Sequence, residues 1–412
     1  MSGPKAMGPV PPEFAAAGEL MLAGRPARDH AAEGTPLFVY DFGMVAARIA
    51  RLRAALPQGV DVHYAVKANP FPPLLAAIAP LIDGMDIASA GELARALGVM
   101  AAARISFAGP GKTDAEIEAA IRVGATLNVE SEREGQRALA IGGRLGKPPC
   151  LAVRVNPDFE LRGSGMKMGG RASPFGVDAA QAAGLVERLI AGGAEWRGFH
   201  IFAGSQSLDS GAISESQAAT IALAGRLADE VGARPPLVNL GGGFGIPYFA
   251  GDAAIDVEGI GRALGQQLDR RPASLAESRF AIELGRWLVG EAGVYLARVV
   301  DRKASGGETF LVVDGGLNHH LAATGNFGTV VRRNYPIAVA HRMGDAPEET
   351  VSVVGPLCTP LDRLGDRVVL PRADAGDLIA VFASGAYGAS ASPTGFLGHP
   401  PARELLVGAP NS

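Results

Sequence analysis

Short apolar runs rich in β-branched residues alternate along the chain with longer segments of helical spacing. From about residue 45, each run is followed by an Ala-, Leu-, Glu- and Arg-rich segment in which apolar residues recur every three or four positions. The runs that predict strands are 61–67, 84–89, 104–109, 126–130, 151–156, 198–204, 237–242 and 279–285. The segments that predict helices include 91–97, 114–123, 132–145, 178–191 and 216–231.

Alternating strands and helices predict a parallel sheet covered by helices. Eight such units in roughly 240 residues match the number and size expected of a TIM-type (β/α)8 barrel. An open, doubly wound α/β sheet stays the alternative, because periodicity alone does not show whether a sheet closes.

The pattern changes after about residue 287, where strand-like runs are separated by turns rather than by long helices. This predicts a C-terminal, mostly antiparallel β domain. A β-like segment over 19–40 precedes the barrel and would complete that sheet. We therefore expect a segment 1–44 that joins the β domain, a barrel over 45–286 and the β domain over 287–412. The first dozen residues contain four prolines, and we expect them to form a loose tail.

Composition narrows the functional classes. The 412 residues are 48% hydrophobic and 19% charged, which predicts a globular protein with a sizeable core. The balance of 38 basic and 42 acidic residues, without a basic run, disfavours nucleic acid and anionic membranes as partners. Cys150 and Cys358 are too few for a disulfide framework. With no targeting segment in evidence, we expect a cytoplasmic protein.

The carboxyl ends of barrel strands are where chemistry gathers in this fold. A lysine, Lys67, ends the first predicted strand. It is either a surface side chain whose stem covers apolar residues or a desolvated amine with a lowered pKa that forms a Schiff base. Glu283 ends the eighth strand and would accept a hydrogen bond from a cofactor ring nitrogen or pair with Arg286. His200 ends the sixth strand and would stack on a cofactor or be a core histidine.

A glycine run, Gly241–Gly245, closes the seventh predicted strand. Loops after strands seven and eight commonly bind phosphate in this barrel, whereas a tight βα turn is the simpler explanation. The dinucleotide fingerprint does not fit, because Ile246 stands where glycine is needed. The Gly111-Lys112-Thr113 run is not a P-loop, because Ser106 occupies the position of its first glycine. The histidines lack the spacing of a metal site, so we expect no metal.

An ordered set of motifs spans the chain from about residue 35 to residue 407. They are Tyr64-Ala65-Val66-Lys67-Ala68-Asn69, Asp86-Ile87-Ala88-Ser89 with Gly91-Glu92-Leu93, Phe199-His200 followed by Gly204-Ser205-Gln206, Gly241–Gly245, Glu283-Leu284-Gly285-Arg286, Val313-Asp314-Gly315, Gly355-Pro356-Leu357-Cys358 and Gly385-Ala386-Tyr387. The set resembles the fold-type III pyridoxal-phosphate decarboxylases, which include the ornithine, arginine and diaminopimelate enzymes.

This resemblance implies a role for each matching residue. Lys67 would hold pyridoxal 5′-phosphate as a Schiff base, His200 would stack on its ring, and Glu283 would keep the ring nitrogen protonated. After the substrate amine has condensed with the cofactor and lost carbon dioxide, Cys358 from the partner subunit of a homodimer would return the proton. The other cofactor-binding residues implied are Asp86, Ser205, Gly242, Gly243, Gly285, Arg286 and Tyr387. The substrate-binding residues would be Asp314, Thr359 and Arg154.

Two positions depart from the family pattern. Leu284 replaces the usual proline of the E-P-G-R motif, and Thr359 replaces the acidic residue that usually follows the cysteine. That acid binds the distal ammonium of basic amino acids, so an uncharged Thr359 disfavours free ornithine or lysine. The run 355–362, the segment GSGMKMGG and the ending SASPTGFLGHP resemble a narrower subgroup. It includes the decarboxylase of carrier-protein-bound glutamate in butirosin biosynthesis and decarboxylases associated with exosortase systems.

The substrate expected from this subgroup is a carrier-protein-bound or acidic amino acid, which needs no pocket for a second ammonium. Decarboxylation of free diaminopimelate, ornithine or lysine stays an alternative. An amino acid racemase is less favoured, because alanine racemases place an arginine where Glu283 stands. A non-catalytic, single-barrel cofactor-binding protein is disfavoured by the long C-terminal domain that carries Cys358 and Tyr387.

Overall fold

The computed structural model describes residues 3–167, 169–170, 172–325 and 332–409. The chain divides into two compact units. The barrel unit comprises 48–245 and 255–285, and the β unit comprises the described parts of 1–47, 246–254 and 286–412.

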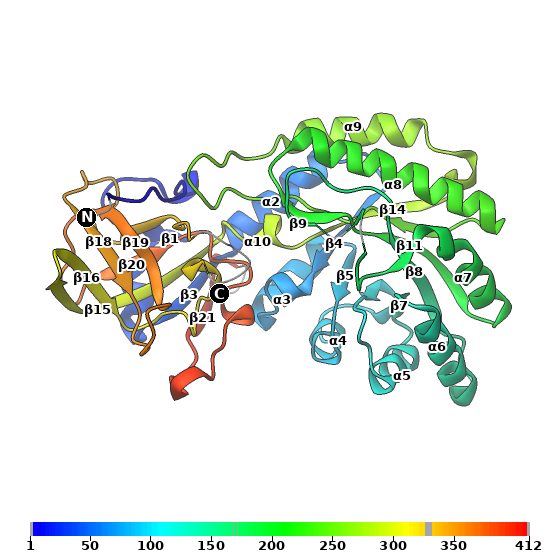
Figure 1. The fold of residues 1–412 in the computed structure, drawn as a ribbon, viewed down its shortest axis with the longest axis horizontal. Coiled ribbons are helices and arrows are strands. Elements are labelled where there is room, and N and C mark those ends of the chain that lie inside the picture. Colours follow the sequence, from blue (N-terminus) through cyan, green and yellow to red (C-terminus); the bar gives the residue numbers. More distant parts are fainter. Residues whose placement is uncertain (1–2, 168, 171, 326–331, 410–412) are drawn as a thin grey trace. The chain divides into compact units, whose positions relative to one another are not determined.

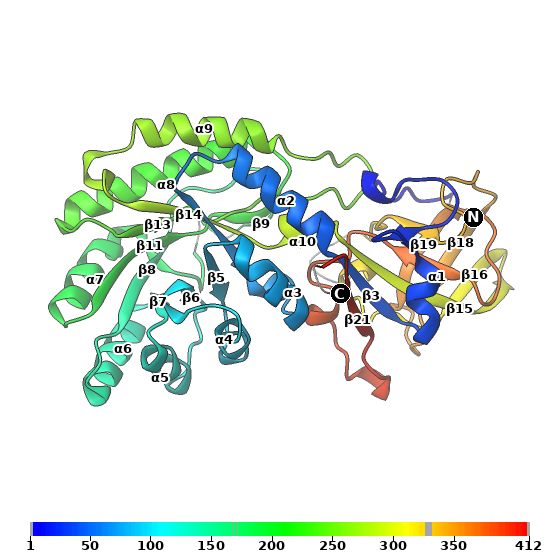
Figure 2. The same cartoon turned by 180° about the vertical axis from the view of Figure 1, so that it is seen from behind.

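The barrel unit is a closed ring of parallel strands with helices on its outside (Figures 1 and 2). Its eight strands are β4 (Val60–Ala65), β5 (Gly84–Ile87), β6 (Ile105–Phe107), β7 (Thr126–Val129), β8 (Cys150–Asn156), β11 (Glu195–Ile201), β13 (Leu237–Asn239) and β14 (Arg279–Leu284). Each strand overlaps one predicted run. The pairings of β7 with β8 and of β14 with β4 complete the ring, which confirms the barrel and excludes the open sheet.

Helices follow the strands around the ring. They are α2 (Phe42–Ala55), α3 (Pro72–Ile78), α4 (Ala90–Leu97), α5 (Asp114–Val123), α6 (Glu132–Leu145), α7 (Ala179–Ala191), α8 (Ser210–Val231) and α9 (Val257–Asp269). Because helices cover the outer face of the sheet, strand residues are buried on both sides, as in β8, where all seven residues are buried. Three short strands, β9 (Ser164–Lys167), β10 (Val177–Asp178) and β12 (Gly204–Ser207), lie in the connections. Strand β12 pairs antiparallel with β9.

Local sequence signals set the helix ends. The Thr113 hydroxyl accepts the backbone N–H of Glu116, whose carboxylate accepts the backbone N–H of Thr113, so α5 begins with a capping box. The helix ends at Gly124, whose φ of 82° suits glycine. Helix α6 repeats the scheme, with Ser131 as its N-cap and Gly146 at φ 62° after its end. The Thr113 of the Gly-Lys-Thr run is therefore a helix cap.

The β unit is built around a mixed, mostly antiparallel sheet (Figure 1). Its strands are β3 (Leu37–Asp41), β15 (Gly293–Ser305), β16 (Glu308–Val313), β17 (Ile337–Val339), β18 (Glu349–Val354), β19 (Arg363–Leu370), β20 (Leu378–Val381) and β21 (Arg403–Val407). The pairs β16–β18 and β21–β3 are parallel, and the other pairs are antiparallel. A small hairpin, β1 (Met21–Leu22) with β2 (Arg25–Pro26), and the short helices α1 (Ala27–His30) and α10 (Arg286–Val289) complete the unit.

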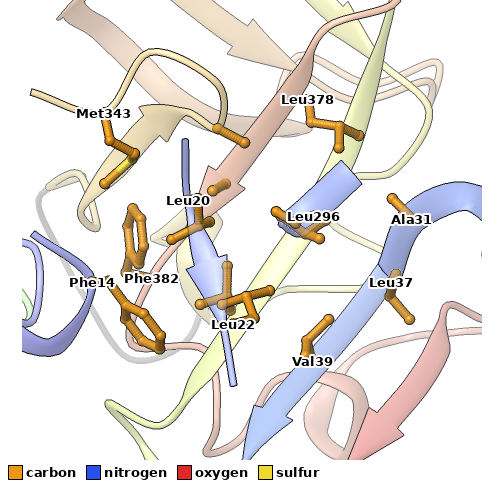
Figure 3. Close-up of a cluster of buried hydrophobic side chains, with 14 of the residues drawn as sticks. Phe14, Leu20, Leu22, Ala31, Leu37, Val39, Leu296, Met343, Leu378 and Phe382 are labelled. Atoms are coloured by element: carbon orange, nitrogen blue, oxygen red, sulfur yellow. The ribbon is translucent and has the colours of Figure 1, made fainter. Parts of the chain in front are cut away.

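The N-terminal residues are not the loose tail that we expected. The backbone N–H groups of Lys5 and Gly8 donate to the carbonyl oxygens of Arg367 and Asn334. Further along, Phe14 is buried with its ring centroid 5.7 Å from that of Phe382, inside the apolar core of the β unit shown in Figure 3. The prolines do not prevent this arrangement, because an extended segment beside a sheet needs only some of its N–H groups.

No helix within the described ranges is long and apolar enough to cross a bilayer. In the same residues, no group of three or more His, Cys, Asp or Glu side chains is placed to hold a metal ion.

Candidate active site

Lys67 stands at the carboxyl end of β4, in the single turn Val66–Ala68. Its Nζ lies 3.9 Å from Glu283 Oε1 at the end of β14 and 5.6 Å from the ring centroid of Phe202. The turn is held close to β14 by Gly285, where a Cβ would lie 2.7 Å from that of Ala68. The Lys67 side chain is 50% exposed, so the residues around it leave the amine in contact with solvent, as in the first of the two alternatives.

Glu283 is a buried carboxylate with positive partners. Its Oε2 lies 2.8 Å from Nε2 of His200, which is also buried. Burial alone would raise the pKa of Glu283, but the hydrogen bond with His200 and the positive charges of Lys67 and Arg154 hold that pKa well below its usual range. The carboxylate pairs with His200 and Lys67, so an ion pair with Arg286 is not its role. Nδ1 of His200 is buried and has no hydrogen-bond partner.

A cavity of about 410 Å³ opens at this end of the barrel. Among its titratable lining residues, four come from the ends of β4, β5, β8 and β14; they are Lys67, Asp86, Arg154 and Glu283. Asp86 is buried, and its Oδ2 lies 3.1 Å from Nδ1 of His63 on the neighbouring strand. Sequence reasoning predicted the four lining residues but missed His63.

Arg154 belongs to a buried network of charged side chains. Its Nη1 donates to Glu130 Oε1 at 3.0 Å, and its guanidinium lies 5.2 Å from the ring centroid of Phe175. Burial alone would raise the pKa of Glu130, but Arg154 and Lys112 lower it. Next to this pair, Lys112 Nζ lies 2.7 Å from Glu134 Oε1, with the lysine side chain only 1% exposed. The lysine of the Gly-Lys-Thr run is thus a buried structural cation that neutralises carboxylates at the edge of the cavity.

The glycine loop after β13 approaches the backbone of β14. A Cβ on Gly242 would lie 1.9 Å from the carbonyl oxygen of Glu283, and Gly243 has a φ of 88°. Both positions therefore require glycine. The Gly243 carbonyl accepts the N–H of Ser207 at 2.8 Å, which fixes strand β12 and its Ser205 beside the loop. Such a loop presents backbone N–H groups to an anion, the chemistry that a phosphate group needs.

Arg286 lies in an aromatic cage within the β unit. Its Nη1 donates to the Tyr248 hydroxyl at 3.0 Å, and its guanidinium lies 4.7 Å from the ring centroid of Tyr387. Burial would lower the pKa of Arg286, but Tyr248, Tyr387 and Tyr335 raise it, so the group stays charged. The Nε atom is buried without a partner, which leaves one donor of the cation for an anionic ligand. Tyr248 and Tyr335 were not predicted.

Cys358 is exposed in the loop between β18 and β19. Buried Asp362 holds this loop, because its two carboxylate oxygens accept the N–H groups of Leu317 at 2.6 Å and Leu357 at 2.9 Å. Thr359 is turned back on the loop, where its Oγ1 accepts the N–H of Leu361 at 3.3 Å. The loop therefore presents the thiol of Cys358 and no carboxylate next to it.

Asp314 follows β16 in the same unit. Its Oδ1 accepts the backbone N–H of Arg298 at 2.8 Å, and its Oδ2 accepts the hydroxyl of Thr35. Each oxygen of this half-buried carboxylate thus already has a fixed donor within the β unit.

Residues 42–290 match the family described as pyridoxal-dependent decarboxylase, pyridoxal binding domain. The chain belongs to this family. The L-glutamyl-[BtrI acyl-carrier protein] decarboxylase of Niallia circulans is 36% identical over 90% of this chain and 88% of its own length. A diaminopimelate decarboxylase of Aquifex aeolicus is 31% identical, covering 95% of this chain and 91% of the relative. The solved diaminopimelate decarboxylase of m. jannaschii in co-complex with L-lysine superposes with a TM-score of 0.86 at 26% identity, over 99% of this chain and 94% of that chain.

This decarboxylase uses pyridoxal phosphate to remove carbon dioxide from an amino acid. The described residues of the barrel unit fit that cofactor, because a glycine loop, an ionised Glu283 and a reachable amine on Lys67 are present there. Within the β unit, the unpartnered buried Nε of Arg286 suits an anionic group. The cofactor supplies an electron sink for the carbanion that decarboxylation leaves. Glu283 is suited to keep a proton on a ring nitrogen, and the unpartnered Nδ1 shows that His200 has polar capacity left for the site.

Proposed function

We propose that the substrate is an amino acid attached to a carrier protein through its distal carboxyl group, as a thioester. Decarboxylation on pyridoxal phosphate requires a free amino group and a free carboxylate on the α-carbon. A carrier is therefore attached only through the side chain, and a thioester there removes the distal charge. The residues that face such a distal end should then include no free carboxylate.

Thr359 is the first residue that supports this proposal. It stands directly after Cys358, where the family usually has the acid that binds a distal ammonium. Its hydroxyl is engaged with the N–H of Leu361, and it carries no charge. Burying an unpaired ammonium beside it would cost several kcal/mol.

The engaged state of Asp314 is the observation that carries the proposal. It is the carboxylate that would otherwise receive a distal ammonium, yet the Arg298 N–H and the Thr35 hydroxyl each occupy one of its oxygens. Asp362, the other nearby acid of the loop, likewise accepts two backbone N–H groups. These donors use one lone-pair position on each oxygen and fix the orientation of the carboxylates, so an ammonium would have only the remaining positions.

The names of the relatives point to two candidate substrates. The relative from Niallia circulans is named for a glutamyl group on an acyl-carrier protein. Relatives at 31–34% identity are named diaminopimelate decarboxylases, and a free diamino acid is therefore the second candidate.

A carbon dioxide release assay distinguishes the two candidates. The panel contains free diaminopimelate, ornithine, lysine and glutamate, together with glutamate linked through its distal carboxyl to a carrier protein or to pantetheine. We expect kcat/KM for the thioesters to exceed that for every free diamino acid by at least 100-fold. Turnover of a free diamino acid at about 10⁴ M⁻¹s⁻¹ or more would overturn the substrate proposal and leave the decarboxylase assignment intact.

A matched pair of variants sharpens the assay. Thr359→Asp restores a carboxylate after Cys358, and we expect it to raise the turnover of free diamino acids and to lower that of the thioester. Thr359→Val keeps the shape of threonine without a charge, and we expect it to leave the order of substrates unchanged. A Thr359→Asp enzyme with the wild-type order of substrates would show that this position does not face the distal end.

We also propose that the active form is a two-fold homodimer in which Cys358 serves the site of the partner subunit. Its support is the exposed thiol in a loop held by Asp362, together with the family membership. Two free cysteines and no disulfide suit the reducing cytoplasm, which is the compartment that we propose.

A further inference from the structure

The amino-terminal end of the barrel contains a second cavity, of about 350 Å³. TIM-type barrels are normally filled at this level by bulky branched side chains. Here small or polar residues on β6, β7, β8 and β13 line the cavity instead; they are Ser106, Asn128, Ala152 and Asn239. A polar space of this size is large enough for water. The side chains of His63 and His200 also line it.

His63 is built into this wall. Its side chain is buried, and its ring lies against Gly84 on the neighbouring strand, where a Cβ would be 2.6 Å from Nε2. Glycine at position 84 therefore makes room for the imidazole. On the other side of the ring, Nδ1 lies 3.1 Å from Oδ2 of Asp86.

Asp86 faces the opposite cavity. Together with Lys67 and Glu283 it lines the cavity at the carboxyl end of the barrel, and its Oδ1 is buried without a hydrogen-bond partner. The His63–Asp86 pair thus separates the two cavities, with the imidazole bordering one and the carboxylate bordering the other.

We propose that His63 is a positioning residue that orients Asp86 and exchanges protons between water in the amino-terminal cavity and the Lys67 side of the active site. In the exchange, the Asp86 carboxylate takes one proton at Oδ1 while the protonated His63 releases one from Nε2 to water, and the proton on Nδ1 stays in its hydrogen bond to Oδ2. The steps run in reverse to deliver a proton. No heavy-atom bond forms or breaks, and no electrons are transferred.

The charges around His63 suit this role. The charged or titratable groups that surround it are Asp61 on its own strand, Asp83 and Asp86 from the β5 side, Glu283 and Arg279 from β14, His200 and Arg197 from β11, and Arg104 before β6. Burial lowers the pKa of His63, but Asp86, Asp61 and Glu283 outweigh burial and raise it above the usual value. These carboxylates therefore favour the protonated imidazole.

The titration of His63 beside Asp86 is measured first, in the absence of substrate. The full chain, labelled with ¹³C at the histidine Cε1 positions and studied both without and with pyridoxal phosphate, gives seven histidine signals by NMR. We expect the His63 signal, assigned by its loss in His63→Asn, to titrate above pH 6.5 and to shift down by at least one pH unit in Asp86→Asn. A signal that titrates below pH 6.5 and ignores Asp86→Asn would overturn the proposal.

Two substitutions then separate positioning from proton exchange. His63→Phe keeps a ring over Gly84 without a hydrogen bond, whereas His63→Asn keeps a donor toward Asp86 without a titrating group. We expect His63→Phe to lower kcat at least tenfold with KM within about threefold, and His63→Asn to recover part of kcat. Both variants should lose one ionisation from the pH dependence of the absorbance of the bound cofactor.

Two control variants test whether the effects come from misfolding or from the loss of any buried histidine. His30→Asn makes the same replacement at a buried histidine of the β unit and should change neither kcat nor the absorbance titration. Ala152→Leu fills the amino-terminal cavity without touching the pair, and we expect it to lower kcat while the His63 pKa stays within half a unit. If His63→Phe binds cofactor normally and keeps the wild-type kcat and pH dependence, His63 has no part in the reaction. None of these results depends on which amino acid is the substrate.

Discussion

Replacing Lys112 by methionine tests the buried charges behind the active site. Lys112 Nζ lies 2.7 Å from Glu134 Oε1 and donates to the carbonyl oxygens of Gly109 at 2.6 Å and Asn128 at 3.0 Å. Unit charges at that separation interact by about 6 kcal/mol at an effective dielectric constant of about 20. Removing one partner of a buried pair typically costs about 3–5 kcal/mol. We expect Lys112→Met to destabilise the barrel unit by this amount, or roughly 6–20 °C in Tm.

The loss has a predicted pH dependence. Burial raises the pKa of Glu134, and Lys112 opposes this rise. Without Lys112, the pKa of Glu134 in the folded protein moves further above its unfolded value of about 4.3. Glu134 therefore keeps its proton up to a higher pH in the folded protein than in the unfolded chain. The destabilisation is therefore small below the unfolded pKa, grows as the pH rises toward the folded pKa, and is largest above it.

Thermal unfolding followed by circular dichroism at pH 5 and pH 8 measures both effects. The double variant Lys112→Met/Glu134→Gln removes both charges, and we expect it to recover at least about half of the loss, since replacing a whole buried pair is often neutral. Lys147→Met, at an exposed lysine of the same unit, should leave Tm unchanged. A double variant as unstable as the sum of the single variants, or a Lys112→Met Tm within roughly 2 °C of wild type at pH 8, would refute the reasoning.

Three further predictions concern the active site. Gly242→Ala would place a Cβ 1.9 Å from the Glu283 carbonyl oxygen, so we expect at least about tenfold weaker cofactor binding in an absorbance titration, and unchanged binding would contradict the packing. Lys67→Ala should bind the cofactor without covalent attachment, so that borohydride followed by mass spectrometry finds no modified chain, and a modified chain would disprove the assignment of Lys67. Mixing inactive Lys67→Ala with inactive Cys358→Ala chains should restore about a quarter of wild-type activity, because half of the dimers are mixed and each has one intact site. No recovery after proven subunit exchange would exclude shared sites.

Most of the barrel could be predicted from the sequence because each βα unit carries its own signals. Apolar runs mark the strands, and residues such as Thr113 and Gly124 mark helix ends through hydrogen bonds close in sequence. Closure could not be predicted, because it depends on the pairing of β14 with β4, which are far apart in sequence. The docking of the N-terminal segment was missed for the same reason, since its partners Asn334 and Arg367 come much later in the chain.

The residues of the active site likewise differ in whether they could be predicted from the sequence. Lys67, His200 and Glu283 could be predicted because the fold gathers strand ends, and the structure does bring these three together. The role of His63 could not, because it depends on the absence of a side chain at Gly84 on the next strand. A polar residue at an inward-facing position of an apolar strand was nevertheless a usable signal. The burial of Lys112 was missed because its partner, Glu134, lies on α6, beyond the helix that follows the lysine.

The parallel pairing of β3 with β21 has a consequence for the synthesis of the chain. The Tyr40 hydroxyl donates to Glu404, which follows 364 residues later. At about 5–20 residues per second, the ribosome needs roughly 20–70 s to make that stretch. The apolar strand β3 lacks both of its neighbours until β15 has been made, and it lacks β21 for the whole interval. We therefore expect Leu37–Asp41 to be a binding segment for chaperones in the nascent protein, and folding of the barrel before β21 is made would shorten the loop that the last strand has to close.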